Sequence, residues 1–181
     1  MLTDFARDHA FTIAWFGLMT MVWMGWGQED PPRRWRWWLG GGSVLGVVLL
    51  GLFGYGVVLR WGDGTALDGR YPWFGVLVVL QVLVAGIGCL LLWRKRQSRW
   101  MAWWVALIVA LHFIPLACLL DDWSLTALGL VQVGCLIVLV RRLKAIGGPT
   151  SRLVGPVMGV TLLVFAMVSI VVFTVTVGTP W

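Results

Sequence analysis

The fold class is decided by the stretch LVGPVMGVTLLVFAMVSIVVFTVTV, which runs from Leu153 to Val177. It contains no Asp, Glu, Lys or Arg, and a helix over it would cross a hydrocarbon core of about 30 Å at about 1.5 Å per residue. In lipid every backbone N–H and C=O needs an internal partner, which leaves only helices and closed barrels. The stretch lacks the apolar–polar alternation of barrel strands. It therefore predicts a membrane-spanning helix.

Five further stretches have the same character, and none of them contains a charged residue. The six predicted spans are Ala10–Trp26, Leu39–Leu59, Trp73–Trp93, Trp100–Leu120, Trp123–Val140 and Leu153–Val177. The connections between them are too short for a soluble domain. We therefore predict an all-α fold: a polytopic integral membrane protein whose residues 1–181 form a single six-transmembrane-helix bundle.

The composition supports this prediction and excludes other classes of protein. Of the 181 residues, 60% are hydrophobic and only 12% are charged. A soluble domain carries a charged fraction of about 25%, because its surface must be covered with polar groups. A soluble enzyme, a disordered tail and a disulfide-stapled secreted module are thereby excluded. Asp4 and Asp8 precede the first span, where a signal peptide would carry positive charge, so we expect this span to be retained.

Positive charge is concentrated in every second connection. The segments Gly27–Trp38, Arg94–Arg99 and Arg141–Arg152 hold eleven of the 14 basic residues and only two of the eight acidic ones. Basic loops remain cytoplasmic, so we predict that both termini lie outside a cytoplasmic (inner) membrane. A composition rich in Arg but with only two Lys is typical of a high-GC bacterial genome.

These basic side chains are expected to contact anionic lipid headgroups, at about 1 kcal/mol per residue. The net charge of +6 follows from this sorting and does not indicate nucleic-acid binding. The predicted headgroup contacts are Arg33, Arg34, Arg36, Arg94, Lys95, Arg96, Arg99, Arg141, Arg142 and Lys144, with Arg152 in the same segments.

The sequence is also rich in tryptophan, with 14 residues, and most of them fall near a predicted span end. An indole ring prefers the headgroup level, since its body is apolar and its N–H needs a polar partner. We interpret these residues as membrane anchors rather than as an aromatic ligand cage.

Two features indicate how the spans pack. Gly42 and Gly46 are four residues apart, as are Gly155 and Gly159. This spacing lets helix backbones approach each other closely. The neighbouring helix could belong to the same chain, to a second copy in a homo-oligomer, or to a partner subunit. Spans three and five also share a run of Trp, Gln, Gly-Cys-Leu and Arg. This similarity indicates either a duplicated helix pair or a chance match between apolar sequences.

Five polar side chains are predicted to lie at one depth, about 12–15 Å below the outer boundary. Polar groups inside the hydrocarbon usually mark function or hold helices together. Sequence spacing does not show whether they face one another. The candidate ligand-binding residues are Thr20, Gln81, His112, Gln132 and Ser169.

His112 is the most informative of them, because Pro115 follows one turn later. Proline removes the hydrogen bond to the carbonyl of Leu111, so we expect a helix kink there. A neutral imidazole both donates and accepts, and could bridge Gln81 and Gln132. The alternative interpretation is a structural hydrogen-bond network between helices.

No catalytic signature is present: no metalloprotease, phosphate-loop or dinucleotide motif, and no Cys-x-x-Cys. We predict no metal site and no cofactor, and an enzymatic role is less expected than a binding role.

The leading hypothesis is binding or passage of a small molecule or ion through the mid-membrane polar site. The alternative is a non-catalytic subunit or accessory protein of a membrane complex. A membrane enzyme acting on a lipid or quinone, with His112 as its base, is the third.

Overall fold

The computed structural model describes residues 4–181, and these fold into six long helices. By length and composition all six could cross a membrane, and the described residues contain no strand. The prediction of an all-helical, multi-pass membrane protein is confirmed at this level. The helices are α1 (Ala6–Trp26), α2 (Trp35–Leu59), α3 (Tyr71–Arg94), α4 (Met101–Leu120), α5 (Trp123–Ile146) and α6 (Ser151–Thr176), with short 3₁₀ turns η1 (Gly27–Glu29) and η2 (Ser98–Trp100).

Several helix ends differ from the predicted span ends. α1 begins at Ala6 rather than Ala10, and α5 continues to Ile146 rather than ending at Val140. The predictions stopped at the first charged residue, whereas a helix continues beyond the hydrocarbon when long charged side chains reach the interface. Cations near a helix C-terminus are also favoured by the helix dipole. The basic residues from Arg141 to Lys144 therefore belong to α5 and not to a loop.

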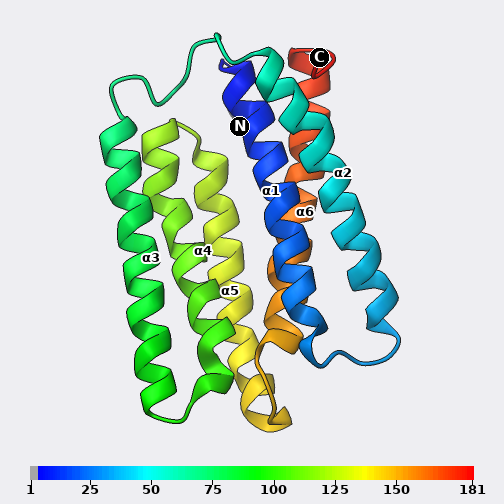
Figure 1. The fold of residues 1–181 in the computed structure, drawn as a ribbon, viewed down its shortest axis with the longest axis vertical. Helices are drawn as coiled ribbons and strands as arrows, with labels where there is room; N and C mark the ends of the chain where they lie inside the picture. The colour runs from blue at the N-terminus through cyan, green and yellow to red at the C-terminus, as the bar shows by residue number, and fades with distance from the viewer. Residues whose placement is uncertain (1–3) are drawn as a thin grey trace.

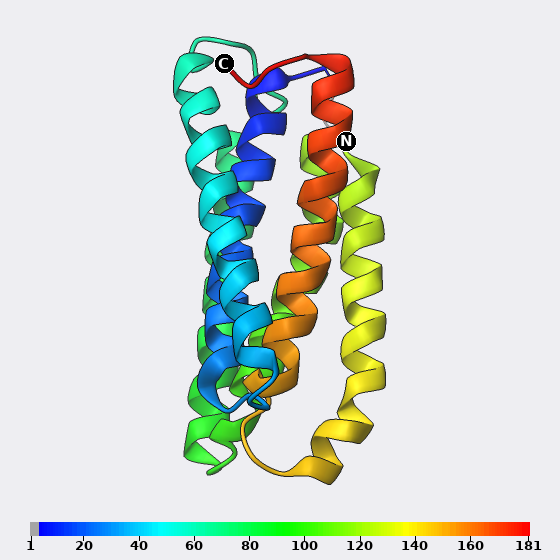
Figure 2. The same ribbon diagram turned by 90° about the vertical axis from the view of Figure 1, so that its right-hand side faces the viewer.

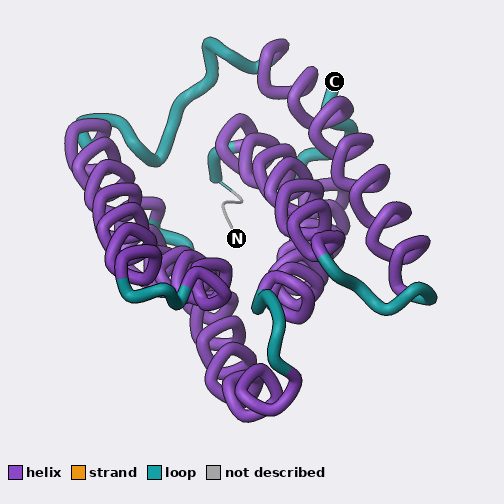
Figure 3. The backbone as a smooth tube through the Cα atoms, turned by 60° about the horizontal axis from the view of Figure 1, so that its bottom comes forward, coloured by secondary structure: helices purple, strands orange, loops and turns teal. Residues whose placement is uncertain are grey.

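The helices form two groups, with α1, α2 and α6 in one and α3, α4 and α5 in the other (Figure 1). α1 packs against both α2 and α6, and α4 packs against both α3 and α5. The groups meet where α6 contacts α5 and α4. Figure 3 shows the long connection over residues 60–70 crossing from one group to the other. The main contacts of α3 are with α4 and η2 alone, so α3 is the peripheral helix.

Glycines allow the closest helix contacts. A Cβ atom on Gly17 of α1 would lie 2.6 Å from the carbonyl oxygen of Gly46 on α2, and one on Gly155 of α6 would lie 2.6 Å from the amide nitrogen of Gly27. The prediction that Gly46 and Gly155 serve close packing is confirmed. Gly42 instead lies against the flexible side chain of Met24.

Aromatic rings fill the seam between the two groups. The ring of Phe16 on α1 lies 5.6 Å from that of Phe113 on α4 and 5.3 Å from that of Phe165 on α6, both edge to face. Phe16 and Phe113 are buried. Such edge-to-face pairs are favoured by the ring quadrupoles, so one residue joins three helices.

Both termini lie at one end of the bundle, which we call the terminal end; it also carries the connections over residues 60–70 and 121–122 (Figure 1). The opposite end carries the α1–α2, α3–α4 and α5–α6 connections, and we call it the basic end. Figure 2 shows the first and last of these side by side. The sorting of basic residues predicted from sequence therefore coincides with one end of the bundle.

The long connection at the terminal end is held to both groups. The carboxylate of Asp8 accepts hydrogen bonds from Thr65 Oγ1 at 2.8 Å and from the amide of Ala66 at 2.7 Å. Arg70 donates to the carboxylate of Asp121 at 2.7 Å, next to the α4–α5 turn. The connection thus links α1 to the α3–α4–α5 group.

We expect Gly155→Ala to destabilise the protein, because the new Cβ would meet the backbone of Trp23 and Gly27, which cannot rotate away. Overpacking of this kind costs about 1–3 kcal/mol. Thermal unfolding in detergent micelles would show a lower midpoint. Gly51→Ala is the matched control, since a Cβ there meets open space. Equal midpoints for the two variants would contradict the close approach of α6 and α1.

Candidate functional site

The predicted polar residues are placed mainly between neighbouring helices. Gln132 of α5 is fully buried, and its Nε2 donates to Thr161 Oγ1 of α6 at 2.9 Å. The hydroxyl of Thr161 in turn lies within hydrogen-bond distance of the carbonyls of Val157 and Met158 in its own helix. The Oε1 atom of Gln132 has no partner among the described residues. Gln132 therefore joins α5 to α6.

Ser169 forms a contact that the sequence interpretation missed. Its hydroxyl lies 2.8 Å from Nε2 of His9, and both side chains are buried. The candidate residues did not include His9, because the first span was predicted to begin only at Ala10. A signal was present: His9, Ile13, Phe16 and Thr20 follow helical spacing, and all four are buried on one face of α1.

Asp122 lies near this pair but does not complete a catalytic triad. Its carboxylate accepts from the amide of Ser124 at 3.0 Å and caps α5. The Nδ1 atom of His9 nevertheless has no hydrogen-bond partner among the described residues, whereas a triad carboxylate accepts from that nitrogen. The His9–Ser169 contact thus joins α1 to α6.

The other three predicted residues have weaker contacts. Thr20 Oγ1 lies 3.5 Å from the carbonyl of Gly159, again between α1 and α6. His112 is half-buried on α4, and its Nδ1 atom has no partner in the described part of the chain. Gln81 is half-buried on the peripheral helix α3, without a hydrogen bond to residues 4–181. α4 continues through Pro115 to Leu120.

The five residues are thus not joined into one hydrogen-bonded site. Three of them hold helix pairs that involve α6, while His112 and Gln81 belong to the other group. Within residues 4–181, no cluster of three His, Cys, Asp or Glu side chains is placed to hold a metal ion.

The structure contains a cavity that the sequence did not predict. It has a volume of about 560 Å³ and lies at the basic end between α3, α4 and α5. We call it the basic-end cavity. Its walls are mainly aliphatic and aromatic, and its polar lining residues are a glutamine and both lysines of the chain. The lining residues are Gly88, Leu91, Leu92, Lys95, Gln97, Trp100, Trp103, Trp104, Val140 and Lys144.

Two adjacent tryptophans build the inner part of this cavity. Trp103 Nε1 donates to the carbonyl of Leu136 on α5 at 3.2 Å, and Trp104 Nε1 donates to the carbonyl of Val84 on α3 at 3.2 Å. Consecutive helical side chains point about 100° apart, so α4 holds one neighbour on each side. Gly88 makes room for the Trp104 ring, which a Cβ there would overlap. α3 and α5 are therefore kept apart, with the cavity between them.

The rim of the cavity is fixed by hydrogen bonds among the connections. Arg99 donates to the carbonyl of Leu143 at 2.8 Å, and its guanidinium lies 5.3 Å from the centre of the Trp100 ring. Thr150 donates through its hydroxyl to the carbonyl of Arg99 at 2.7 Å, and that hydroxyl accepts from the amide of Trp103 at 3.3 Å. Arg99, predicted to contact lipid headgroups, is thus directed toward α5 instead.

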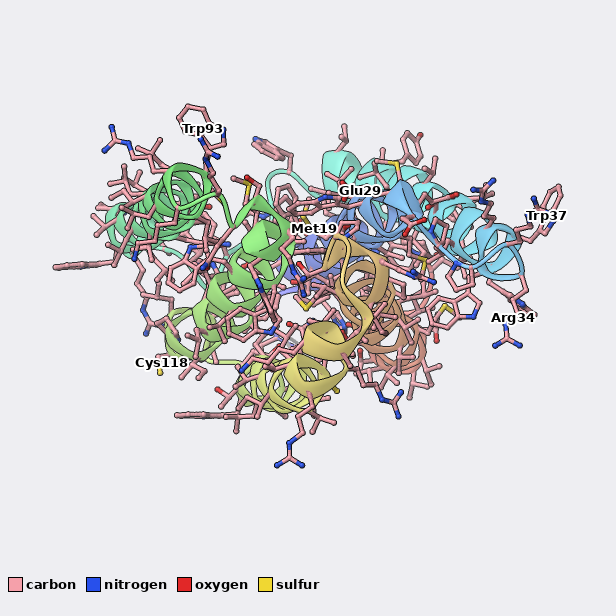
Figure 4. The ribbon with its side chains drawn as sticks, turned by 90° about the horizontal axis from the view of Figure 1, so that it is seen from below. Met19, Glu29, Arg34, Trp37, Trp93 and Cys118 are labelled. Carbon is pink, nitrogen blue, oxygen red and sulfur yellow. The ribbon has the colours of Figure 1, made fainter. Side chains whose placement is uncertain are left out.

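The remaining predicted headgroup contacts are exposed at the basic end, with several tryptophans beside them. In the view along the bundle from that end, Arg34, Trp37 and Trp93 point outward (Figure 4). Trp37 is 87% exposed, which is the exposure expected of an interfacial anchor. Arg152 differs, since it pairs with Asp30 at 3.4 Å.

No protein-family model matches this chain, and no curated protein or solved structure is significantly similar to it.

We expect a measurable coupling between Gln132 and Thr161. In a double-mutant cycle with Gln132→Leu and Thr161→Val, the two losses of unfolding free energy should be non-additive by about 0.6 kcal/mol, the average for hydrogen bonds between membrane helices. Val keeps the shape of Thr, so packing changes little at that position. Additive losses would show that the 2.9 Å contact contributes nothing to stability.

Proposed function

We propose that this chain is a multi-pass protein of a cytoplasmic (inner) membrane that binds a small amphiphilic molecule in the basic-end cavity. The observation that supports the proposal is the composition of that cavity: three tryptophans and four glycine or aliphatic residues, with Lys95, Gln97 and Lys144 as the polar lining residues. Ligand pockets are typically of this kind, largely apolar with a few placed polar groups, and have volumes of about 300–1,000 Å³.

The lining favours binding over catalysis. It includes no carboxylate, imidazole, hydroxyl or thiol, so among the usual general acids, bases and nucleophiles only the amines of its two lysines are present. The lysines could hold an anionic group in place. The proposed role is accordingly recognition of a ligand rather than its chemical conversion.

In our proposal the basic end faces the cytoplasm and both termini face outward, as the excess of Lys and Arg at the basic end supports. The cavity then opens at the level of the inner-leaflet headgroups, within reach of amphiphiles that diffuse in that leaflet.

A C-terminal fusion tests this orientation. A reporter that is active only in the cytosol, fused after Trp181, should be inactive, and one that is active only outside should be active. The same reporters placed after Gln97, in the α3–α4 connection, should behave in the opposite way. Activity of the cytosolic reporter after Trp181 would refute the orientation.

Two alternatives keep some support. Binding or passage of a small molecule or ion at the predicted mid-membrane site is favoured by the unpartnered His112 Nδ1 and Gln132 Oε1 atoms. A role as a non-catalytic subunit is favoured by α3, of which only Gly88 is buried, so that most of its surface is open to lipid or to a partner. In the first case His112→Ala would abolish liposome flux; in the second, the chain would co-purify with a partner in mild detergent.

Filling the cavity tests the binding proposal directly. We expect Val140→Trp to abolish retention of one amphiphile per chain, because the larger ring occupies the space between α3 and α5. The measurement is native mass spectrometry of the protein in micelles with added lysophospholipids of mixed headgroup. Val138→Trp is the matched control, on the same helix but 72% exposed and outside the lining. Equal retention in both variants would place the ligand elsewhere.

A further inference from the structure

We propose, building on the binding role above, that the ligand of the basic-end cavity carries a phosphate monoester headgroup on a single apolar chain. The headgroup lies between Lys95 and Lys144, and the chain lies along the tryptophans and aliphatic residues of α3, α4 and α5. The proposal begins from an unequal distribution of basic residues. Only two of the 14 are lysines, and both line this cavity.

The two lysines come from opposite walls. Lys95 follows the last residue of α3, and Lys144 lies in the last turn of α5. These helices have no substantial contact with each other, since each packs on α4 instead. A group between the two ammonium ions would therefore link walls that the protein itself leaves apart.

The charge of the lysines is not compensated by the protein. None of the ion pairs among the described residues involves Lys95 or Lys144, and the cavity lining contains no acidic residue. The site thus offers two positive charges to a ligand. A phosphate monoester carries a charge of about −1.5 to −2 at neutral pH and comes closest to neutralising them. A carboxylate or a phosphodiester leaves one charge unbalanced, and a choline headgroup adds a third cation.

Lysine also suits this ligand in its chemistry. An ammonium group is a compact charge with three donors on a flexible stem, and it binds phosphate as a point charge. The amide of Gln97 lies in the same lining and can donate to a further phosphate oxygen. The surrounding arginines are excluded from the lining, and Arg99 is already bound to Leu143.

The apolar walls determine where selectivity arises. An acyl chain in the membrane gains little by leaving lipid for an apolar protein wall, because lipid tails are equally apolar. Preference for one amphiphile over another must therefore come from the headgroup. Removal of the lysine charges should consequently reduce selectivity between headgroups without preventing entry of the acyl chain into the cavity.

The test compares four probes by native mass spectrometry of the full chain in micelles: lysophosphatidic acid, lysophosphatidylcholine, oleate and inorganic phosphate. We expect lysophosphatidic acid to bind most tightly. Each lysine charge near the membrane surface contributes about a fivefold change in affinity. The double variant Lys95→Gln/Lys144→Gln should therefore lower the affinity for lysophosphatidic acid about 30-fold. Its affinity for lysophosphatidylcholine should change little.

Two further variants keep the inference falsifiable. Arg141→Gln/Arg142→Gln removes the same charge from exposed positions of α5 outside the lining, and should keep the preference for lysophosphatidic acid. Lys95→Arg/Lys144→Arg keeps the charge and should retain most of the binding, which separates lost charge from lost folding. An equal loss in both glutamine variants would overturn the inference, because it would indicate general surface attraction.

The remaining outcomes separate the inference from the binding role on which it depends. If Val140→Trp blocks binding but the four probes show no headgroup preference, the binding role stands and the phosphate inference fails. If inorganic phosphate alone binds as tightly as lysophosphatidic acid, the site recognises a free anion, and the inference that the ligand is an amphiphile is refuted. If no probe binds to the wild-type chain, both proposals fail together.

Discussion

In a membrane, apolar side chains gain nothing by exchanging lipid for another helix, so helices associate through close backbone packing and hydrogen bonds between them. α1 has both. Its backbone meets α2 at Gly17 and Gly46, and its buried side chains His9 and Thr20 reach the serine and the backbone of α6. The aromatic contact of Phe16 then extends this group to α4. α2 and α6 are therefore arranged around α1, and α3 and α5 are arranged around α4.

α3 has few such contacts and is packed loosely as a result. Its only buried residue is Gly88, and its hydrogen bond from a neighbouring helix comes from Trp104. Both contacts are with α4 and lie toward the basic end. α3 therefore has no second neighbour to close the space beside it. The basic-end cavity is a consequence of this sparse packing, combined with the rigid rim formed by Arg99 and Thr150.

The sequence predicted the spans well because apolar length and exclusion of charge are properties of a single helix. The common depth of the polar residues was inferred in the same way, from spacing along each helix. The sequence could not predict their direction around each helix, and this decides whether Gln132 meets Thr161 or His112. His9 was missed because the predicted first span began at Ala10, although the spacing of His9 to Phe16 and Thr20 contained the signal. The cavity could not be predicted, since Lys95 and Lys144 line one space only because α3 and α5 both pack on α4.

The location of the cavity also bears on binding versus passage. The three buried polar residues that join α6 to its neighbours each contact another helix, Gln132 through Nε2 alone, and Phe16, Phe113 and Phe165 fill the seam between the two helix groups. A charged group at the bilayer centre costs about 2.5–3.5 kcal/mol. At the basic end, by contrast, a charged headgroup can remain at the interface while its chain enters between α3 and α5. For these reasons we propose binding of an amphiphile that arrives from one leaflet and returns to it, rather than passage of a solute across the bundle.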